Sequence, residues 1–200
     1  MRKKARIGSL FLTETKTLLL LLLLLFPAES HAQASVALGA TRQEQSEFNA
    51  DPSERVTHPI HVPNAVLQVL AKDTAVAACM KDNPIAPGES LSSWFTASEI
   101  HLNGSDEADL VVLPVAQGDA YMCFRYFEGI GWFWVFRPIG DRYELVLKTA
   151  GLGISVLDTR HNGYRDIRSV GQVGEWSTTT TFRFKDGHYR EFKKDTKELQ

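Results

Sequence analysis

Residues 131–137 read Gly-Trp-Phe-Trp-Val-Phe-Arg, and the five residues between the glycine and the arginine are all apolar. Aromatic and β-branched residues favour β-strands, in which successive side chains point to opposite faces of the sheet. A strand that is apolar on both faces must be covered on both. We therefore expect this segment at the centre of a sheet, with a helix packed on one face.

The chain around this segment has the pattern of short strands separated by turns. From residue 93 onward, runs rich in β-branched and aromatic residues alternate with Gly, Asn and Asp. Asp186-Gly187 is a hairpin signal, because a tight reversal requires positive φ angles. The expected strands cover residues 108–115, 121–127, 131–137, 143–149, 153–157, 166–173, 178–184 and 188–192.

One helix is expected before the strands, over residues 64–82. Asn64 is a suitable N-cap, Pro84 ends the segment, and a break near Asp73-Thr74 is left open. The fold class is therefore α+β, with an N-terminal helical segment packed on an antiparallel β-meander. Apolar residues recur at three- and four-residue intervals, at Val66, Val69, Leu70, Val76, Ala77 and Met80.

The first 34 residues have the order of a secretory signal peptide. A basic head precedes the apolar run Leu18–Phe26, and the small-residue triplet Ala32-Gln33-Ala34 follows. The run has nine residues, whereas a helix needs about 20 to cross a bilayer core. We expect cleavage between Ala34 and Ser35, and a secreted or periplasmic protein with no membrane span after cleavage.

The rest of the chain divides into a lead-in and one domain. Residues 35–62 are largely polar and have no periodic apolar pattern, so we expect a flexible lead-in. Residues 63–200 are expected to form a single α+β domain.

The charge balance argues against nucleic acid as a partner. The chain has 22 Lys and Arg and 24 Asp and Glu; residues 1–34 hold five of the basic and two of the acidic residues, which leaves 17 against 22. Nucleic-acid binding requires clustered basic residues. The cluster Lys193-Lys194 with Lys197 is interrupted by Asp195, as is typical of a solvated tail.

The cysteines Cys79 and Cys123 both lie in the part that would be exported. An even number of cysteines in an oxidising compartment predicts a disulfide. The alternative is that both are small buried hydrophobic residues. The bond would close a loop of about 45 residues and stabilise the fold by about 3–4 kcal/mol.

Two stretches of the chain resemble each other at an offset of 57 to 59 residues. Asn103-Gly104 precedes the strand that starts at Asp109, and Asn162-Gly163 precedes the one at Asp166. Residues 124–129 likewise parallel residues 182–187. A duplicated β-unit explains this similarity. The alternative, that turn geometry selects Asn-Gly in any meander, remains open.

The first copy, residues 100–112, resembles the calcium loop and following strand of the FG-GAP or VCBS-type repeats of integrin-like β-propellers. Asn103 and Asp109 match the ligand positions, and Ser105 is a weaker oxygen donor, but the leading Asp is replaced by His101. The resemblance implies a calcium-loop-like metal site. Since calcium prefers six to eight oxygen ligands, we expect a scaffold turn here and no cofactor.

A second resemblance covers the order of motifs along the chain, and it is to small exported bacterial proteins of unassigned function. It implies no chemistry. The motifs are the helix, Trp94-Phe95, Asn103-Gly104, the Trp-Phe-Trp strand and residues 162–166.

The candidate ligand-binding residues are Trp176 and Tyr164, because both lie next to turns rather than inside apolar runs. The histidines show no helical or metal-ligand spacing, and no nucleophile motif occurs, so no catalytic residue is expected. The sequence favours an exported, non-enzymatic binding or inhibitor-like module of the cell envelope, with a protein or glycan partner. The alternatives are a cell-wall or polysaccharide hydrolase using Asp106, Glu107 or Asp109, and a purely structural envelope protein.

Overall fold

The computed structural model describes residues 44–51, 56–115, 122–124 and 130–199. The expected signal peptide and its expected cleavage site lie outside the described residues. The chain divides into the units Met1–Thr41 and Arg42–Gln200, and every described residue belongs to the second unit. That unit is mostly β-structure with a few short helices. Its elements are β1 (Glu47–Asn49), α1 (Asn64–Leu70), α2 (Thr74–Asp82), the 3-10 helix η1 (Leu91–Trp94), β2 (Phe95–Ile100), β3 (Asp109–Pro114), β4 (Gly131–Ile139), β5 (Arg142–Gly151), β6 (Gly153–His161), β7 (Tyr164–Val173), β8 (Trp176–Lys185) and β9 (His188–Glu198).

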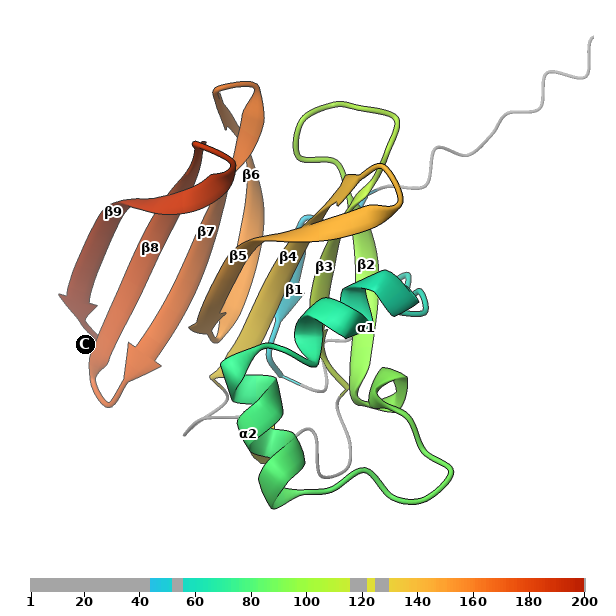
Figure 1. The fold of residues 1–200 in the computed structure, drawn as a ribbon. Helices are drawn as coiled ribbons and strands as arrows, with labels where there is room; N and C mark the ends of the chain where they lie inside the picture. The colour runs from blue at the N-terminus through green and yellow to red at the C-terminus, as the bar shows by residue number, and fades with distance from the viewer. Residues whose placement is uncertain (1–43, 52–55, 116–121, 125–129, 200) are drawn as a thin grey trace, which may run out of the picture. The chain divides into compact units, whose positions relative to one another are not determined.

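The strands form two antiparallel sheets rather than one meander (Figure 1). One sheet has the order β2-β3-β4-β5, and the other has the order β1-β6-β7-β8-β9. The chain passes from the first sheet to the second at Gly151-Leu152-Gly153. A Cβ atom on Gly151 would lie 2.5 Å from the carbonyl oxygen of Val170, so glycine is required where the strands approach so closely.

The expectation for the segment Trp132–Phe136 is confirmed. The segment belongs to β4, between β3 and β5, and both faces of this sheet are covered. Phe133 and Val135 pack against residues of the five-stranded sheet. Trp134 and Phe136 pack on the opposite side, with Val66 and Leu70 of α1 and Val76 and Cys79 of α2.

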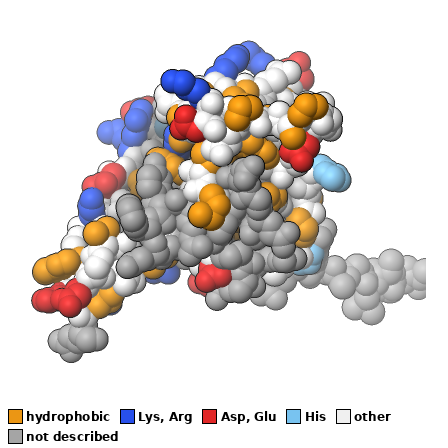
Figure 2. Space-filling view, turned by 90° about the horizontal axis from the view of Figure 1, so that it is seen from below, with side chains coloured by type: hydrophobic (Ala, Val, Ile, Leu, Met, Phe, Trp, Pro, Cys, Tyr) orange, Lys and Arg blue, Asp and Glu red, His pale blue; other side chains and the backbone are white. Residues whose placement is uncertain are grey.

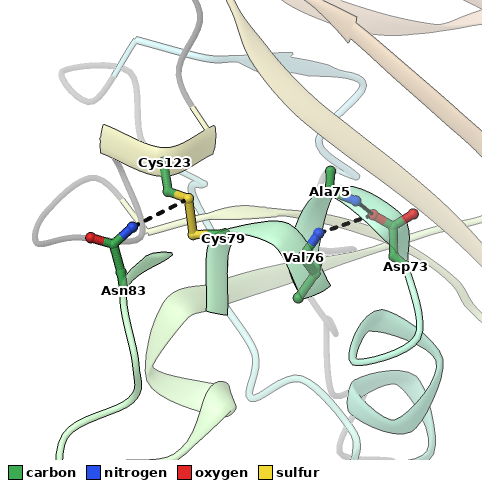
Figure 3. The surroundings of a disulfide bond; sticks show 6 residues. All are labelled: Asp73, Ala75, Val76, Cys79, Asn83 and Cys123. Carbon is green, nitrogen blue, oxygen red and sulfur yellow. Dashed lines mark hydrogen bonds between the residues drawn. A yellow bond between two sulfur atoms is a disulfide. The ribbon is translucent and has the colours of Figure 1, made fainter. Parts of the chain in front are cut away.

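The helix is broken near Asp73-Thr74, which the sequence left open, and the break has a clear cause. Asp73 lies between α1 and α2, and its carboxylate accepts hydrogen bonds from the backbone N–H groups of Ala75 and Val76 (Figure 3). Asp73 is therefore the N-cap of α2. The expected cap at Asn64 is wrong, because Asn64 is the first helical residue and Pro63 occupies the N-cap position without a side-chain bond.

The disulfide between Cys79 and Cys123 is present, with a Cα–Cα distance of 5.8 Å (Figure 3). It joins α2 to residues 122–124, which are helical, so the strand expected over 121–127 is wrong for its described residues. Phe124 packs against the rings of Phe95 and Trp134, which also contact each other, and this aromatic cluster outweighs the β-propensity of the segment.

Part of the segment expected as a lead-in contributes to the fold. Glu47–Asn49 pairs with β6, and Phe48 is 1% exposed in the core between the two sheets. Ile60 exchanges backbone hydrogen bonds with Ala97 and so covers the free edge of β2.

Two turns that precede or join strands have the geometry that the sequence indicated. Asn162 and Gly163 have φ angles of 53° and 82°, and Asp186 and Gly187 have 51° and 86°. These positive angles are typical of two-residue hairpin loops. The strand after Asp186-Gly187 is longer than expected: β9 reaches Glu198, so the basic cluster read as a solvated tail lies in a strand.

Candidate functional site

The most exposed tryptophan with a defined neighbourhood is Trp176, at the start of β8. Its side chain is 52% exposed, and Val173, directly opposite on β7, is 76% exposed. On the other side, Trp176 pairs with Glu198 of β9. Side chains of directly paired residues lie on the same face of a sheet, so these three form one row. The surface made by this row is called the Trp176 surface below.

The next row of the sheet adds hydroxyl groups to the Trp176 surface. Thr178 of β8 lies between Gly171 of β7 and Thr196 of β9. The hydroxyl oxygens of Thr178 and Thr196 are 3.2 Å apart and within hydrogen-bond distance. An indole ring, two hydroxyls and the carboxylate of Glu198 therefore share one face of the sheet.

Sheet topology explains why the Trp176 surface is open. β6 starts at Gly153 opposite Val170, so the last residues of β7 have no strand beside them on that side among the described residues. The ends of β7, β8 and β9 extend past the core, at the lower left of Figure 1, where the C-terminus also lies. Figure 2 shows hydrophobic and acidic side chains together at the left end of the molecule.

Tyr164, the second candidate residue, is held by contacts within the fold. Its ring stacks on Phe184 with 3.8 Å between ring centroids, and its hydroxyl accepts a hydrogen bond of 3.0 Å from Arg137 of β4. Arg137 in turn pairs with Glu144 of β5 at 2.6 Å. Tyr164 thus links the two sheets.

The structure does not bring Trp176 and Tyr164 together. Tyr164 is the first residue of β7, and Trp176 is paired with Val173, the last one. A strand of this length spans about 30 Å at 3.3 Å per residue. The two residues therefore cannot line one small groove.

The loop between β2 and β3 is a hydrogen-bonded turn. The side chain of Asn103 accepts a bond from the backbone N–H of Ser105 at 3.0 Å, and the hydroxyl of Ser105 donates to the carbonyl of Glu107. Asp109 is buried and accepts a bond of 2.9 Å from the backbone N–H of Leu102. No group of three or more His, Cys, Asp or Glu able to hold a metal ion occurs among the described residues. Three of the loop's oxygen groups are thus already engaged in local bonds.

The carboxylates suggested for a hydrolase differ in their surroundings. Asp106 and Glu107 are exposed on the loop, whereas Asp109 is buried and bonded to Leu102. Glycoside hydrolysis generally requires two carboxyl groups on either side of the scissile bond, about 5–9.5 Å apart. The hydrolase alternative stays a prediction.

Sequence reasoning missed a histidine–aspartate pair on the hairpin between β6 and β7. Nδ1 of His161 lies 2.8 Å from Asp166, whose side chain is 3% exposed. The hydroxyl of Thr159 donates to the same carboxylate at 2.9 Å, and Arg183 lies 3.7 Å from it. The sequence does carry a signal for this pair, because the two-residue loop Asn162-Gly163 places His161 and Asp166 on facing strands of one hairpin. Thr159 donates to Asp166 rather than to the histidine, so the arrangement is that of a hairpin anchor and not of an activated nucleophile.

The two Asn-Gly segments lie next to each other. The carbonyl of Leu102 accepts hydrogen bonds from the backbone N–H of Arg165 at 2.7 Å and from the guanidinium of Arg160 at 3.0 Å. The loop before β3 and the hairpin before β7 therefore pack together at one end of the fold, as Figure 1 shows at the top.

Replacement of Asp109 is expected to destabilise the fold. Asp109→Ala leaves the N–H of Leu102 without its acceptor, at a cost of about 1–3 kcal/mol, whereas Asp109→Asn keeps an acceptor oxygen. Burial raises the pKa of Asp109 above its ordinary value of 3.8, and the bond from Leu102 only partly opposes this. The wild type should therefore lose stability relative to Asp109→Asn as the pH rises above 3.8. The free energies of unfolding of the wild type and Asp109→Asn would be measured in urea below pH 3.8 and at neutral pH. A difference in stability between the wild type and Asp109→Asn that is the same at both pH values would contradict this prediction.

No family model, curated protein or solved structure matches this chain. Among the residues that the structure describes, no helix is both long enough and apolar enough to cross a membrane.

Proposed function

We propose that this chain is an exported, non-catalytic binding domain of the cell envelope, and that it holds a glycan on the Trp176 surface. The observation that supports this proposal is the exposed indole of Trp176 beside Val173, with hydroxyl and carboxylate groups on the same face. Exposed large apolar side chains that gather at one place are typical of interaction sites.

The chemistry of the surface favours a glycan over a protein. Among the described residues, its apolar part consists of Trp176 and Val173, whereas a stable protein interface buries about 800 Å² on each partner around a larger apolar centre. A sugar ring needs one aromatic face for its C–H groups and nearby groups that exchange hydrogen bonds with its hydroxyls. Thr178, Thr196 and Glu198 are suitable for this second role.

The export of the protein is part of the proposal and rests on residues 1–34. The Cys79–Cys123 disulfide supports an oxidising compartment, because such bonds are rare where thiols are kept reduced. A purely structural role in the envelope would need no exposed indole of this kind.

The internal repeat is proposed in a revised form. Each sheet contains four strands that are neighbours in chain order, β2 to β5 and β6 to β9, and an Asn-Gly pair separates the first two strands in each. This supports two related β-units. The parallel between residues 124–129 and 182–187 is not part of it, since Phe124 is helical and Phe182 lies in β8.

Binding to purified polysaccharides tests the function. The chain from Ser35 onward, Trp176→Ala and Phe192→Ala would be compared by affinity electrophoresis in soluble glycans and by co-sedimentation with peptidoglycan. Phe192 is the matched control, because it is 55% exposed but contacts Arg183 and His161 instead. We expect Trp176→Ala to lose about tenfold or more in affinity, as truncated aromatic anchors do, and Phe192→Ala to bind normally.

Two outcomes would overturn the proposal. One is that no glycan retains the wild type, or that Trp176→Ala is retained equally well. The other is that retention by a crude envelope fraction is abolished by protease treatment, which would identify a protein partner instead.

A further inference from the structure

The outer strand of the five-stranded sheet, β9, has an open edge. It pairs with β8 on one side, and no described strand lies on the other (Figure 1). All residues from Arg190 to Glu198 are exposed. An open edge offers backbone N–H and C=O groups to another strand, and charged side chains on it usually prevent such pairing.

Hydrogen bonding to β8 determines which backbone groups of β9 face outward. The N–H of Leu199 donates to the carbonyl of Glu175, next to the pair Trp176 and Glu198. Hydrogen-bonded and non-hydrogen-bonded residues alternate along an antiparallel strand. Lys194, Thr196 and Glu198 therefore direct their backbone groups away from β8, towards the open edge.

The charge pattern of this edge matches itself in one register. If a second copy pairs antiparallel about Thr196, then Lys194 lies opposite Glu198 of the second copy, and Asp195 lies opposite its Lys197. Each of these opposite-charge pairs occurs twice by symmetry. A register centred on Lys193, Lys194, Asp195 or Lys197 places at least one residue opposite a like charge, because each of these residues would face itself.

Two further features of β9 favour the Thr196-centred register. The bulge in the β8–β9 pair lies between Thr181 and Phe182, opposite residues 191–193 of β9, so the pairing from Lys193 to Glu198 is regular. The body of the domain packs on the opposite end of the strand, where Tyr189 is buried. In an antiparallel pair that overlaps only near Thr196, the two bodies lie at opposite ends and do not collide.

We propose that two copies of this chain associate through β9, antiparallel about Thr196, and join their five-stranded sheets into one continuous sheet. The two-fold axis is perpendicular to the sheet, so both Trp176 surfaces lie on the same face. Association rests on the strand edge and its charges. It shares Thr196 and Glu198 with the Trp176 surface, but its tests measure the oligomeric state and not glycan binding.

Charge reversal tests this interface. Sedimentation equilibrium would be measured for the wild type, Lys194→Glu, Glu198→Lys, the double variant with both changes, and Arg190→Glu. Each single reversal at 194 or 198 creates two like-charge pairs and should weaken the dimer by about tenfold or more, and the double variant should restore it. Arg190→Glu is the matched control, because it makes the same charge change at an exposed residue outside the paired segment. Thermal melts would show that every variant is folded.

Cross-linking provides a second readout that does not depend on charge. Both native cysteines are in the disulfide, so Thr196→Cys introduces the sole free thiol of the exported chain. Directly opposed residues in a hydrogen-bonded antiparallel pair have Cα atoms about 5.5 Å apart, which suits a disulfide. Thr196→Cys should form a covalent dimer on mild oxidation, and Arg190→Cys should not. A monomeric wild type at high protein concentration, or a dimer that neither single reversal weakens, would overturn the proposal.

Discussion

Trp134→Ala is expected to destabilise the fold by about 3–5 kcal/mol, the usual cost of removing a large aromatic side chain from a core. Trp134 is fully buried in β4, and its ring makes edge contacts with Phe95 and Phe124 at centroid distances of 5.5 and 5.7 Å. Removal of the indole therefore leaves a cavity between the four-stranded sheet and the helices. Urea denaturation of the wild type and Trp134→Ala, monitored by far-UV circular dichroism, would measure the loss in the free energy of unfolding.

The control for this experiment is Trp134→Phe. The indole Nε1 of Trp134 is buried and has no hydrogen-bond partner among the described residues. Phenylalanine keeps most of the packing and removes this unsatisfied N–H, so it should cost much less than alanine. Equal losses for the two variants would show that the indole does not fill the space that the structure assigns to it.

Removal of the disulfide is expected to have the second largest effect. The bond closes a loop with a sequence separation of 44 residues and joins α2 to the helical residues 122–124. The double variant Cys79→Ala with Cys123→Ala should lose about 3–4 kcal/mol, because the unfolded chain regains the freedom that the cross-link removes. The midpoint of urea unfolding would be compared for the wild type and the double variant.

A reductant is the matched control for the disulfide. It should lower the stability of the wild type to about that of the double variant and leave the double variant unchanged. Alkylation of both thiols in denaturant without reductant would contradict the bond itself.

Local patterns in the sequence predicted the elements whose cause is local. The two-faced apolar run in β4, the hairpin at Asp186-Gly187 and the helix break at Asp73 each depend on a few adjacent residues. The division into two sheets could not be read in this way. It depends on the close approach of Gly151 to Val170, which are distant in sequence.

Three segments differed from expectation because distant contacts decide them. β1 has only three residues and is held by Phe48, which is too short a pattern to stand out in a polar segment. Residues 122–124 are helical because Phe124 packs with aromatic rings of β2 and β4. The end of β9 has the sequence pattern of a solvated tail because neither of its faces is apolar.

At the candidate site, too, contacts between residues that are distant in sequence could not be predicted from local patterns. Proximity to a turn predicted exposure correctly for Trp176, whose neighbours come from the adjoining strands β7 and β9. Tyr164 is half-buried, because Arg137 and Phe184 reach it from other strands. Its role as a ligand-binding residue is therefore not part of the proposed function.

The indole N–H signals of the four tryptophans test the Trp176 surface most directly. They would be followed by ¹⁵N–¹H correlation spectroscopy during titration with an oligosaccharide from the glycan that retains the protein, with Trp176→Phe to assign one signal. We predict that the Trp176 signal shifts, together with the backbone amides of Val173, Thr178 and Thr196, while the buried Trp94 and Trp134 signals stay in place. A Trp176 signal that does not move while amides of the 103–109 loop or the 159–166 hairpin shift would contradict the proposed site.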